Sequence, residues 1–245
     1  MTGFRSFVAT DTGPRRHHNE DNYADRPGLG LWAVADGAGG HEAGEVASGM
    51  IRAALEAIPP GLDAAEMLAE VRGQLLDVHT ALREEAARRG PGAMIASTVV
   101  VLLARGNHYA ALWAGDSRIY LLRDGALSPV TRDHSLVQEM VDAGTLAAAE
   151  AERHPYANVI TRAVGAGGEA LELETATDAA QPGDRFLLCS DGLTKTLPEA
   201  EIAALLAGPD DTDPAQRLLA AALARNAGDN VTALVVIWPG AKPNE

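Results

Sequence analysis

The sequence is poor in several residue types, and each shortage narrows the possible fold or function. Cys189 is the single cysteine among 245 residues, which excludes a disulfide framework and a cysteine-based zinc site. It lies in the apolar run 185–189, so we expect a buried and inert thiol. Aromatic residues make up 4% of the chain and apolar residues 47%, so the core must consist mainly of Ala, Val, Leu and Ile.

The sequence also lacks the patterns of membrane and exported proteins. No apolar run approaches the roughly 18 residues of a membrane span. No N-terminal apolar stretch resembles a signal peptide. We therefore expect a soluble, cytoplasmic protein with no membrane contact.

Basic residues are outnumbered, with 20 Lys and Arg against 34 Asp and Glu and a formal net charge of −14. Such a surface repels nucleic-acid phosphates, so we expect no nucleic-acid partner. The acidity either keeps the protein soluble or gathers carboxylates around cations. Composition does not separate these two causes, whereas the positions of the carboxylates do.

The hydrophobic pattern predicts strands and helices in a mixed order. Helical periodicity covers residues 42–58, 63–88, 199–206 and 214–225, and strand-like runs cover 31–35, 97–104, 108–114, 118–122, 185–190 and 231–238. The three runs between 97 and 122 are too close together for parallel crossovers, so we expect antiparallel neighbours. This order favours an α+β fold in which helices cover antiparallel sheet.

We expect a single domain over residues 1–238 and a frayed tail over 239–245, where Pro and Gly return. Residues 132–166 combine polar residues with a short helical pattern. They predict a long excursion from the sheet, and segments of this kind often carry function.

Several carboxylates stand beside apolar runs. They are Asp36, Asp116, Asp191 and Asp229, with Asn19-Glu20-Asp21 early in the chain. An Asp-Gly pair after a strand is ordinary turn chemistry, and Asp124-Gly125 fits a hairpin turn of that kind. Several such residues at one rim of a sheet would repel one another unless cations neutralised them. Oxygen ligands without clustered Cys or His suit magnesium, manganese or calcium and not zinc.

In order along the chain, five motifs together resemble one known family. They are Gly13-x-x-Arg16-x-x-Asn19-Glu20-Asp21, Val34-Ala-Asp36-Gly37-Ala-Gly-Gly-His41, Gly115-Asp116-Ser117-Arg118, Ser190-Asp191-Gly192-Leu193 and Gly228-Asp229-Asn230-Val231-Thr232. From about residue 8 to 237 the chain is similar to the bacterial type 2C (PPM family) metal-dependent serine/threonine protein phosphatases. The resemblance implies two packed antiparallel sheets flanked by pairs of helices, with residues 132–166 as a flap.

The resemblance also implies a chemistry: water held between two Mn²⁺ or Mg²⁺ ions attacks phosphoserine or phosphothreonine. By the same resemblance, Asp36 bridges the two ions and the Gly37 carbonyl binds one of them. Asp191 and Asp229 hold the first ion, and Asp21 acts as a ligand directly or through water.

Four further residues receive roles from the resemblance. Glu20 acts through bound waters, and Asp116 serves a weaker third ion. Arg16 binds the substrate phosphate, because a guanidinium can pair with two phosphate oxygens. Asn230 supports the site.

The sequence departs from the family pattern after Asp36-Gly37. Ala38 stands where bacterial relatives commonly carry Met and where animal relatives carry the histidine proposed as general acid. His41 is then the candidate that donates a proton to the leaving oxygen, or it only supports the metal-bound waters. His17 and His18 are expected at the surface beside Arg16.

The expected partners are phosphorylated proteins, including a bacterial serine/threonine kinase or its substrates, in signal transduction; the protein is expected to be a monomer. Two alternatives stay open. A catalytically weak phosphoprotein-binding module would normally have lost ligands, and here the expected carboxylates are present. A small-molecule phosphatase is compatible with the residues, because the metal core recognises phosphate and not the group behind it.

Overall fold

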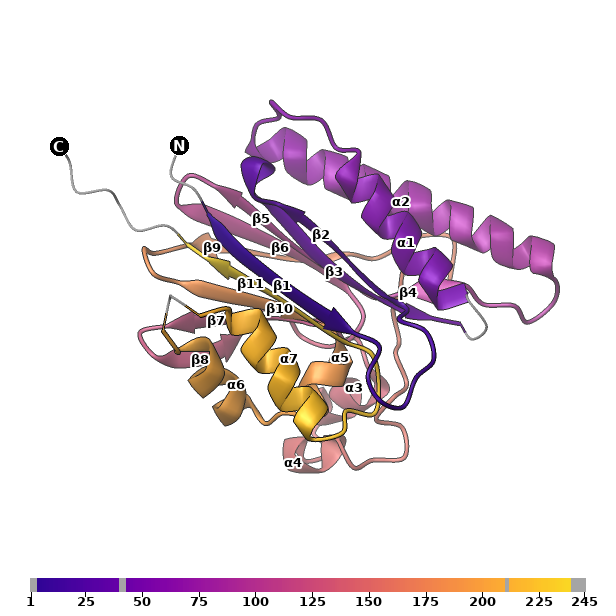
Figure 1. Ribbon diagram of the computed structural model, residues 1–245. Coiled ribbons are helices and arrows are strands. Elements are labelled where there is room, and N and C mark those ends of the chain that lie inside the picture. Colours follow the sequence, from indigo (N-terminus) through magenta and orange to yellow (C-terminus); the bar gives the residue numbers. More distant parts are fainter. Residues whose placement is uncertain (1–3, 40–42, 210–211, 239–245) are drawn as a thin grey trace.

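The computed structural model describes residues 4–39, 43–209 and 212–238, and its two antiparallel sheets pack face to face with helices outside (Figure 1). The predicted α+β sandwich is therefore confirmed. The tail predicted at 239–245 lies outside the described residues. Within the described residues, no helix combines the length and the apolar character needed to cross a membrane.

The most buried strands lie inside each sheet and the more exposed ones at its edges. The five-stranded sheet has the order β1 (Arg5–Asp11), β11 (Val231–Ile237), β10 (Arg185–Cys189), β7 (Arg118–Arg123), β8 (Ala126–Pro129). The six-stranded sheet has the order β2 (Asp21–Arg26), β3 (Leu31–Ala38), β5 (Val99–Arg105), β6 (His108–Ala114), β9 (Glu174–Ala179), with β4 (Ala96–Ser97) paired to β3. All of β11 and all but the last residue of β5 are buried, which explains why these strands are continuous apolar runs.

Helices cover the outer face of each sheet (Figure 1). A short turn of 3₁₀ helix (Pro27–Leu29), α1 (Ala43–Glu56) and α2 (Ala64–Arg89) belong to the six-stranded side. On the five-stranded side are α5 (Asp191–Thr194), α6 (Glu199–Leu206) and α7 (Pro214–Ala224), and α3 (Leu136–Asp142) and α4 (Ala148–Ala151) lie within residues 132–166. A capping box starts α2, since Asp63 accepts from the Glu66 amide and Glu66 accepts from the Asp63 amide.

Three apolar clusters separate the layers. One lies between α1–α2 and the six-stranded sheet, and a second lies between α5–α7 and the five-stranded sheet. The third fills the space between the sheets, where Trp32, Phe186 and Leu234 are fully buried. Cys189 is fully buried as predicted, and burial raises the pKa of its thiol to about 12.

One predicted pairing is wrong. The runs 108–114 and 118–122 were expected to be antiparallel neighbours, but β6 belongs to the six-stranded sheet and β7 to the other. The chain changes sheet at Gly115, where φ is 117° and a Cβ would lie 2.5 Å from the Cβ of Thr98. A tight bend at glycine lets consecutive strands of a sandwich enter different sheets.

Two glycines set the distance between α1 and β3. A Cβ on Gly44 would lie 2.7 Å from the carbonyl carbon of Gly37, and a Cβ on Gly37 would lie 2.2 Å from the carbonyl oxygen of Gly44. Gly49, on the same helix, has open space around it. Only the first of the two helical glycines is therefore required by packing.

We expect Gly44→Ala to lower the free energy of unfolding by about 1–3 kcal/mol, because the added methyl group overpacks the helix against the strand. We expect Gly49→Ala to raise it by about 0.5–1 kcal/mol, because alanine has the higher helix propensity. Denaturant unfolding followed by circular dichroism checks both variants. Equal effects of the two substitutions would contradict the close packing at Gly44.

Candidate functional site

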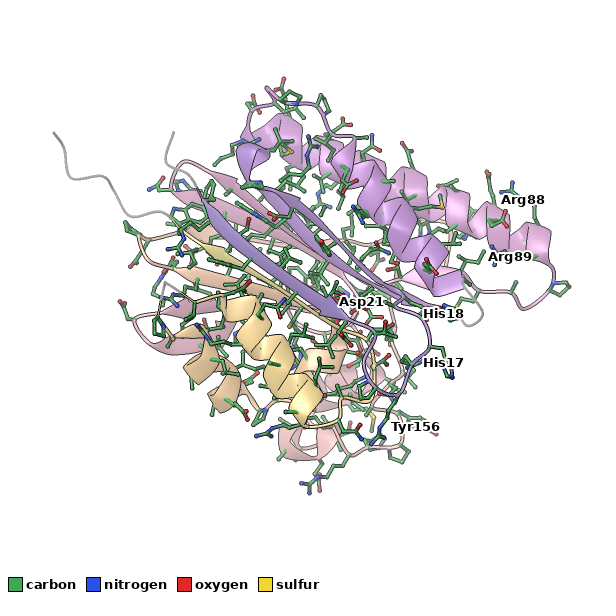
Figure 2. All side chains as sticks on the ribbon, viewed as in Figure 1. His17, His18, Asp21, Arg88, Arg89 and Tyr156 are labelled. Atoms are coloured by element: carbon green, nitrogen blue, oxygen red, sulfur yellow. The ribbon has the colours of Figure 1, made fainter. Side chains whose placement is uncertain are left out.

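The predicted carboxylates gather at one end of the sandwich. A cavity of about 590 Å³ is lined by Asp36, Asp116, Asp191 and Asp229, together with Glu20, Gly37, Arg16 and Lys195. Asp21 is 6% exposed and is hydrogen-bonded to Ser190, next to Asp191; Figure 2 shows this residue where the β1–β2 loop enters β2. The structure thus brings together residues that are up to 213 positions apart, from Arg16 to Asp229.

Strand register places two of these carboxylates directly opposite each other. Asp21 and Asp36 are Cα partners in the antiparallel pair β2–β3. Like charges at directly opposed positions are destabilising. This pair therefore needs compensation from its surroundings.

The Asp21 carboxylate joins the two sheets. Its Oδ2 accepts hydrogen bonds from Ser190 Oγ and Thr232 Oγ1, each at 2.7 Å. Asp21 belongs to the six-stranded sheet, whereas its two donors lie at the ends of β10 and β11 in the other sheet. The hydrogen bonds fix the position of the carboxylate from across the sandwich.

A second set of hydrogen bonds connects Asp36 to Asp116. The Asp36 amide donates to Thr98 Oγ1 at 3.2 Å, and the Thr98 amide donates to the Asp36 carbonyl at 2.9 Å. Thr98 Oγ1 is also hydrogen-bonded to Ser117 Oγ at 2.7 Å, next to Asp116. Thr98 was not singled out in the sequence, because a threonine in an apolar strand gives no signal of its own.

Two basic side chains form ion pairs with two of the carboxylates. Arg16 Nη2 lies 2.7 Å from Asp229 Oδ2, and Lys195 Nζ donates to Asp191 Oδ2. Arg16, predicted to bind phosphate, is half exposed and therefore reaches both the cavity and solvent. Lys195 was missed in the sequence, although its spacing of four residues from Asp191 on a helical turn was available as a signal.

Asn230 connects the β1–β2 loop to the start of β11. Its side-chain oxygen accepts from the Glu20 amide at 2.9 Å, and its amide group donates to the carbonyls of Thr12 and His18. The Glu20 carbonyl in turn accepts from Ser48 Oγ and from the Gly37 amide. Asn230 therefore supports the loop that carries Arg16 and Glu20.

Burial makes the carboxylates costly to ionise. Burial raises the pKa of Asp21 to about 7, against the hydrogen bonds from Ser190 and Thr232, which lower it. Burial, and then repulsion by Asp191, raises the pKa of Asp116 to about 7. Burial, and then repulsion by Asp21, raises the pKa of Asp36 well above its ordinary value. Each of these shifts is the kind that a bound cation reverses.

The donor atoms fit a hard divalent cation. Within the described part of the chain, Asp21 Oδ1, Asp116 Oδ1 and Asp191 Oδ1 are buried without a hydrogen-bond partner. Carboxylate oxygens of this kind suit Mg²⁺ and Mn²⁺. Among the described residues no three acidic, His or Cys side chains already form a ligand set, and Arg16 and Lys195 engage Asp229 and Asp191.

Backbone geometry separates the site aspartates from turn aspartates. Asp36-Gly37 lies inside β3 and Asp191-Gly192 opens α5, so neither pair forms a turn. Asp124-Gly125 forms the β7–β8 hairpin turn as predicted, with φ of 51° and 78°. Of the three Asp-Gly pairs, the turn interpretation therefore applies to Asp124-Gly125 alone.

Of the histidines considered for the site, His17 and His18 are among the described residues and His41 is not. His17 and His18 are exposed on the β1–β2 loop, as predicted (Figure 2). His41, the candidate for the general acid or for support of the metal-bound waters, lies in residues 40–42, outside the described residues. Ala38, at the position that departs from the family pattern, lines the cavity.

The raised pKa values predict how the metal-free protein responds to pH. Between about pH 4 and pH 7, the carboxyl groups of Asp21 and Asp116 are protonated in the folded state but ionised in the unfolded state. Their contribution to the free energy of unfolding is therefore fully present below about pH 4 and is lost as the pH rises through about 7. With chelator present, we expect the unfolding midpoint to fall by about 4–8 °C between pH 5.5 and pH 8, as for a loss of about 2 kcal/mol in a chain of this size.

A substitution isolates the cause. Asp36→Asn removes one buried charge, so we expect the metal-free variant to unfold at a higher temperature than the unchanged protein at pH 8. The matched control is Asp77→Asn, at an exposed position on α2. Thermal scans that show no difference between pH 5.5 and pH 8 would refute the assigned repulsion.

Comparisons with known proteins agree with the site and the fold. The model of the family described as protein phosphatase 2C matches residues 15–228. The serine/threonine protein phosphatase PstP of Mycobacterium tuberculosis is 37% identical over 232 residues, which are 94% of this chain and 44% of that protein. The chain thus spans less than half the length of this relative.

Two solved structures share the fold over almost their whole length. PppA, described as a key regulatory component of the T6SS in Pseudomonas aeruginosa, has a TM-score of 0.88 and 44% identity, over 96% of this chain and 97% of that one. The catalytic domain of the serine/threonine protein phosphatase PstP in complex with two manganese ions has a TM-score of 0.85 and 34% identity, over 96% and 99%. The ordered motifs, the sandwich and these matches agree: the chain belongs to the protein phosphatase 2C family.

Proposed function

We propose that this protein hydrolyses phosphoserine and phosphothreonine in proteins, with two Mn²⁺ or Mg²⁺ ions held by the carboxylates of the cavity. The observation that carries the proposal is the convergence of buried, partnerless carboxylate oxygens from both sheets on one cavity. Family membership supports the reaction, and the related PstP catalytic domain binds two manganese ions.

The proposed ligands come from four strand ends. Asp36 would bridge the two ions, and the Gly37 carbonyl would bind one of them. Asp191 and Asp229 would hold the first ion, and Asp21 would act directly or through water. Asp36 and Gly37 share β3, which keeps the bridging carboxylate and the carbonyl in fixed register.

Three other residues complete the proposed site. Glu20 would hold water ligands, because its backbone is fixed by Asn230 and Ser48. Asn230 would keep that loop in place. Asp116 would serve a third, weaker ion.

When bound, the two cations lower the pKa of a water molecule and neutralise the negative charge of a phosphate monoester. The chain itself orients the substrate. The guanidinium of Arg16, once released from Asp229, can pair with two phosphate oxygens, and its half-exposed position lets it reach a phosphate in the cavity. No protein nucleophile takes part, in agreement with the buried Cys189.

The domain, general-acid, partner and location predictions rest on the sequence alone. We propose that residues 1–238 form one catalytic domain with a flap at 132–166, which includes α3 and α4. His41 stays the candidate for the general acid or for a residue that only supports the metal-bound waters. A bacterial kinase or its substrates as partners, a monomeric state and a cytoplasmic location stay predictions.

We expect Asp36→Asn to lower the rate of phosphopeptide hydrolysis roughly 100-fold or more, because the loss of several kcal/mol of charge stabilisation costs a factor of ten for each ~1.4 kcal/mol. Asp124→Asn is the matched control, since it changes the aspartate of an Asp-Gly pair at the hairpin turn, where Asn is also tolerated. Phosphate release is measured with Mn²⁺ and again with chelator. Unchanged turnover by Asp36→Asn would refute the metal assignment.

The same assay separates the alternatives. Phosphoserine and phosphothreonine peptides are compared with phosphotyrosine peptides and with phosphorylated metabolites. We expect the first two to be hydrolysed fastest. Faster hydrolysis of metabolites would favour a small-molecule phosphatase, and metal binding without any turnover would favour a phosphoprotein-binding module.

We expect Arg16→Ala to lower kcat/KM on phosphopeptides about tenfold, mainly through KM, because one charge-assisted phosphate contact is lost. Arg15→Ala, which removes the adjacent exposed arginine, controls for the general loss of positive charge in the loop. Steady-state kinetics at saturating Mn²⁺ distinguishes the two variants. Equal kcat/KM values for both would contradict a direct role of Arg16 in phosphate binding.

A further inference from the structure

Lys195 is an unusual residue for this chain. The sequence has 18 arginines and two lysines, Lys195 and Lys242, and the first of these lies at the carboxylate cavity. It follows α5 directly, four residues after Asp191, and its Nζ donates to Asp191 Oδ2. The Lys195 side chain is 40% exposed, whereas that of Asp191 is 13% exposed.

The ammonium group lies within the field of several carboxylates. Lys195 donates to Asp191 and lines the same cavity as Asp116 and Asp36. The ammonium therefore acts on Asp116 as well as on its hydrogen-bonded partner.

Two cavities meet at this group. Lys195, Asp116 and Asp191 line the cavity of about 590 Å³ and also a neighbouring cavity of about 320 Å³, whose lining includes residues of the predicted flap. Asn158 of the flap belongs to both linings. Lys195 therefore stands at the boundary between the proposed metal centre and the flap.

The two carboxylate oxygens of Asp191 have different surroundings. Among the described residues, Oδ1 is buried and has no hydrogen-bond partner, whereas Oδ2 accepts from Lys195. Oδ1 of Asp116 is likewise buried without a partner. One oxygen of Asp191 is thus left for an ion of the two-ion centre, while the other is already neutralised by the ammonium.

We propose that the ammonium of Lys195 supplies the positive charge beside Asp116 and Asp191 that a third divalent cation would otherwise supply, and so keeps the affinity for that ion low. This inference rests on the two-ion function proposed for the site. A lysine suits the role because its ammonium is a compact point charge, whereas arginine presents a planar fork. Lys195 is a positioning residue, since it acts through the carboxylates.

A simpler role is a surface ion pair between residues four apart on a helical turn, which contributes little to stability. Such an ion pair would form equally well if the carboxylate of residue 191 were exposed. It also does not predict any change in the number of ions bound. The count of bound ions therefore separates the two roles.

The test is Mn²⁺ binding by equilibrium dialysis and calorimetry at pH 7.5, with the full chain. We expect the unchanged protein to bind two ions tightly and a third weakly. Lys195→Met keeps the aliphatic stem and removes the charge, so we expect it to bind the third ion at least about tenfold more tightly. Lys195→Arg keeps the charge, and we expect it to match the unchanged protein.

Two further variants place the ion. Asp116→Asn added to Lys195→Met should abolish the gain, whereas Asp133→Asn added to the same variant should leave most of it. Thermal scans verify folding, which the exposure of Lys195 favours. Equal third-ion affinity in the unchanged protein and Lys195→Met would overturn the inference, as would a gain in Lys195→Arg. Failure of the unchanged protein to bind two ions would instead refute the proposed two-ion function, and the inference with it.

Discussion

The mutual repulsion of buried carboxylates is the constraint on which this structure depends. Asp21 and Asp36 face each other across β2 and β3, and Asp116 and Asp191 approach from strands of both sheets. A fold that only needed stability would replace such a cluster with apolar residues, since unpaired buried charges are costly. The cluster is compatible with the fold because protons, two nearby basic groups or divalent cations can neutralise its charge. Of these, only divalent cations would also make the cluster catalytic.

The rest of the sandwich holds these groups in place while they repel one another. Hydrogen bonds from Ser190 and Thr232 to Asp21 join the two sheets, and those of Asn230 attach the β1–β2 loop to β11. The close approach of Gly37 and Gly44 lets α1 press on the strand that carries Asp36. The site is therefore built mainly on strands and their ends, which gives the precision that catalysis requires.

Sequence patterns predicted the parts of this architecture in which local chemistry decides the outcome. The central strand β11 is apolar on both faces, and the Asp-Gly pair at 124 lies between two short runs, so both were predictable. Strand β9 was missed because its sequence Glu174–Ala179 is polar and lies at a sheet edge, where β6 supplies the pairing. The pairing of β6 with β7 was predicted wrongly. Two apolar runs separated by a short segment with a glycine are the pattern both of a hairpin and of a bend between sheets, such as the one at Gly115. The carboxylates could be found from their positions at strand ends, but the role of Lys195 depends on contacts between segments that no local pattern records.

We propose that the carboxylates of both sheets would hold two cations, with Asp36 as a shared ligand. Crystals grown with Mn²⁺ and measured at the manganese absorption edge test it most directly, because anomalous scattering locates each ion independently of any assumed ligand. We expect two strong peaks in the cavity, both beside the Asp36 carboxylate, with Arg16 moved away from Asp229. A single peak, or peaks that do not contact Asp36, would contradict it.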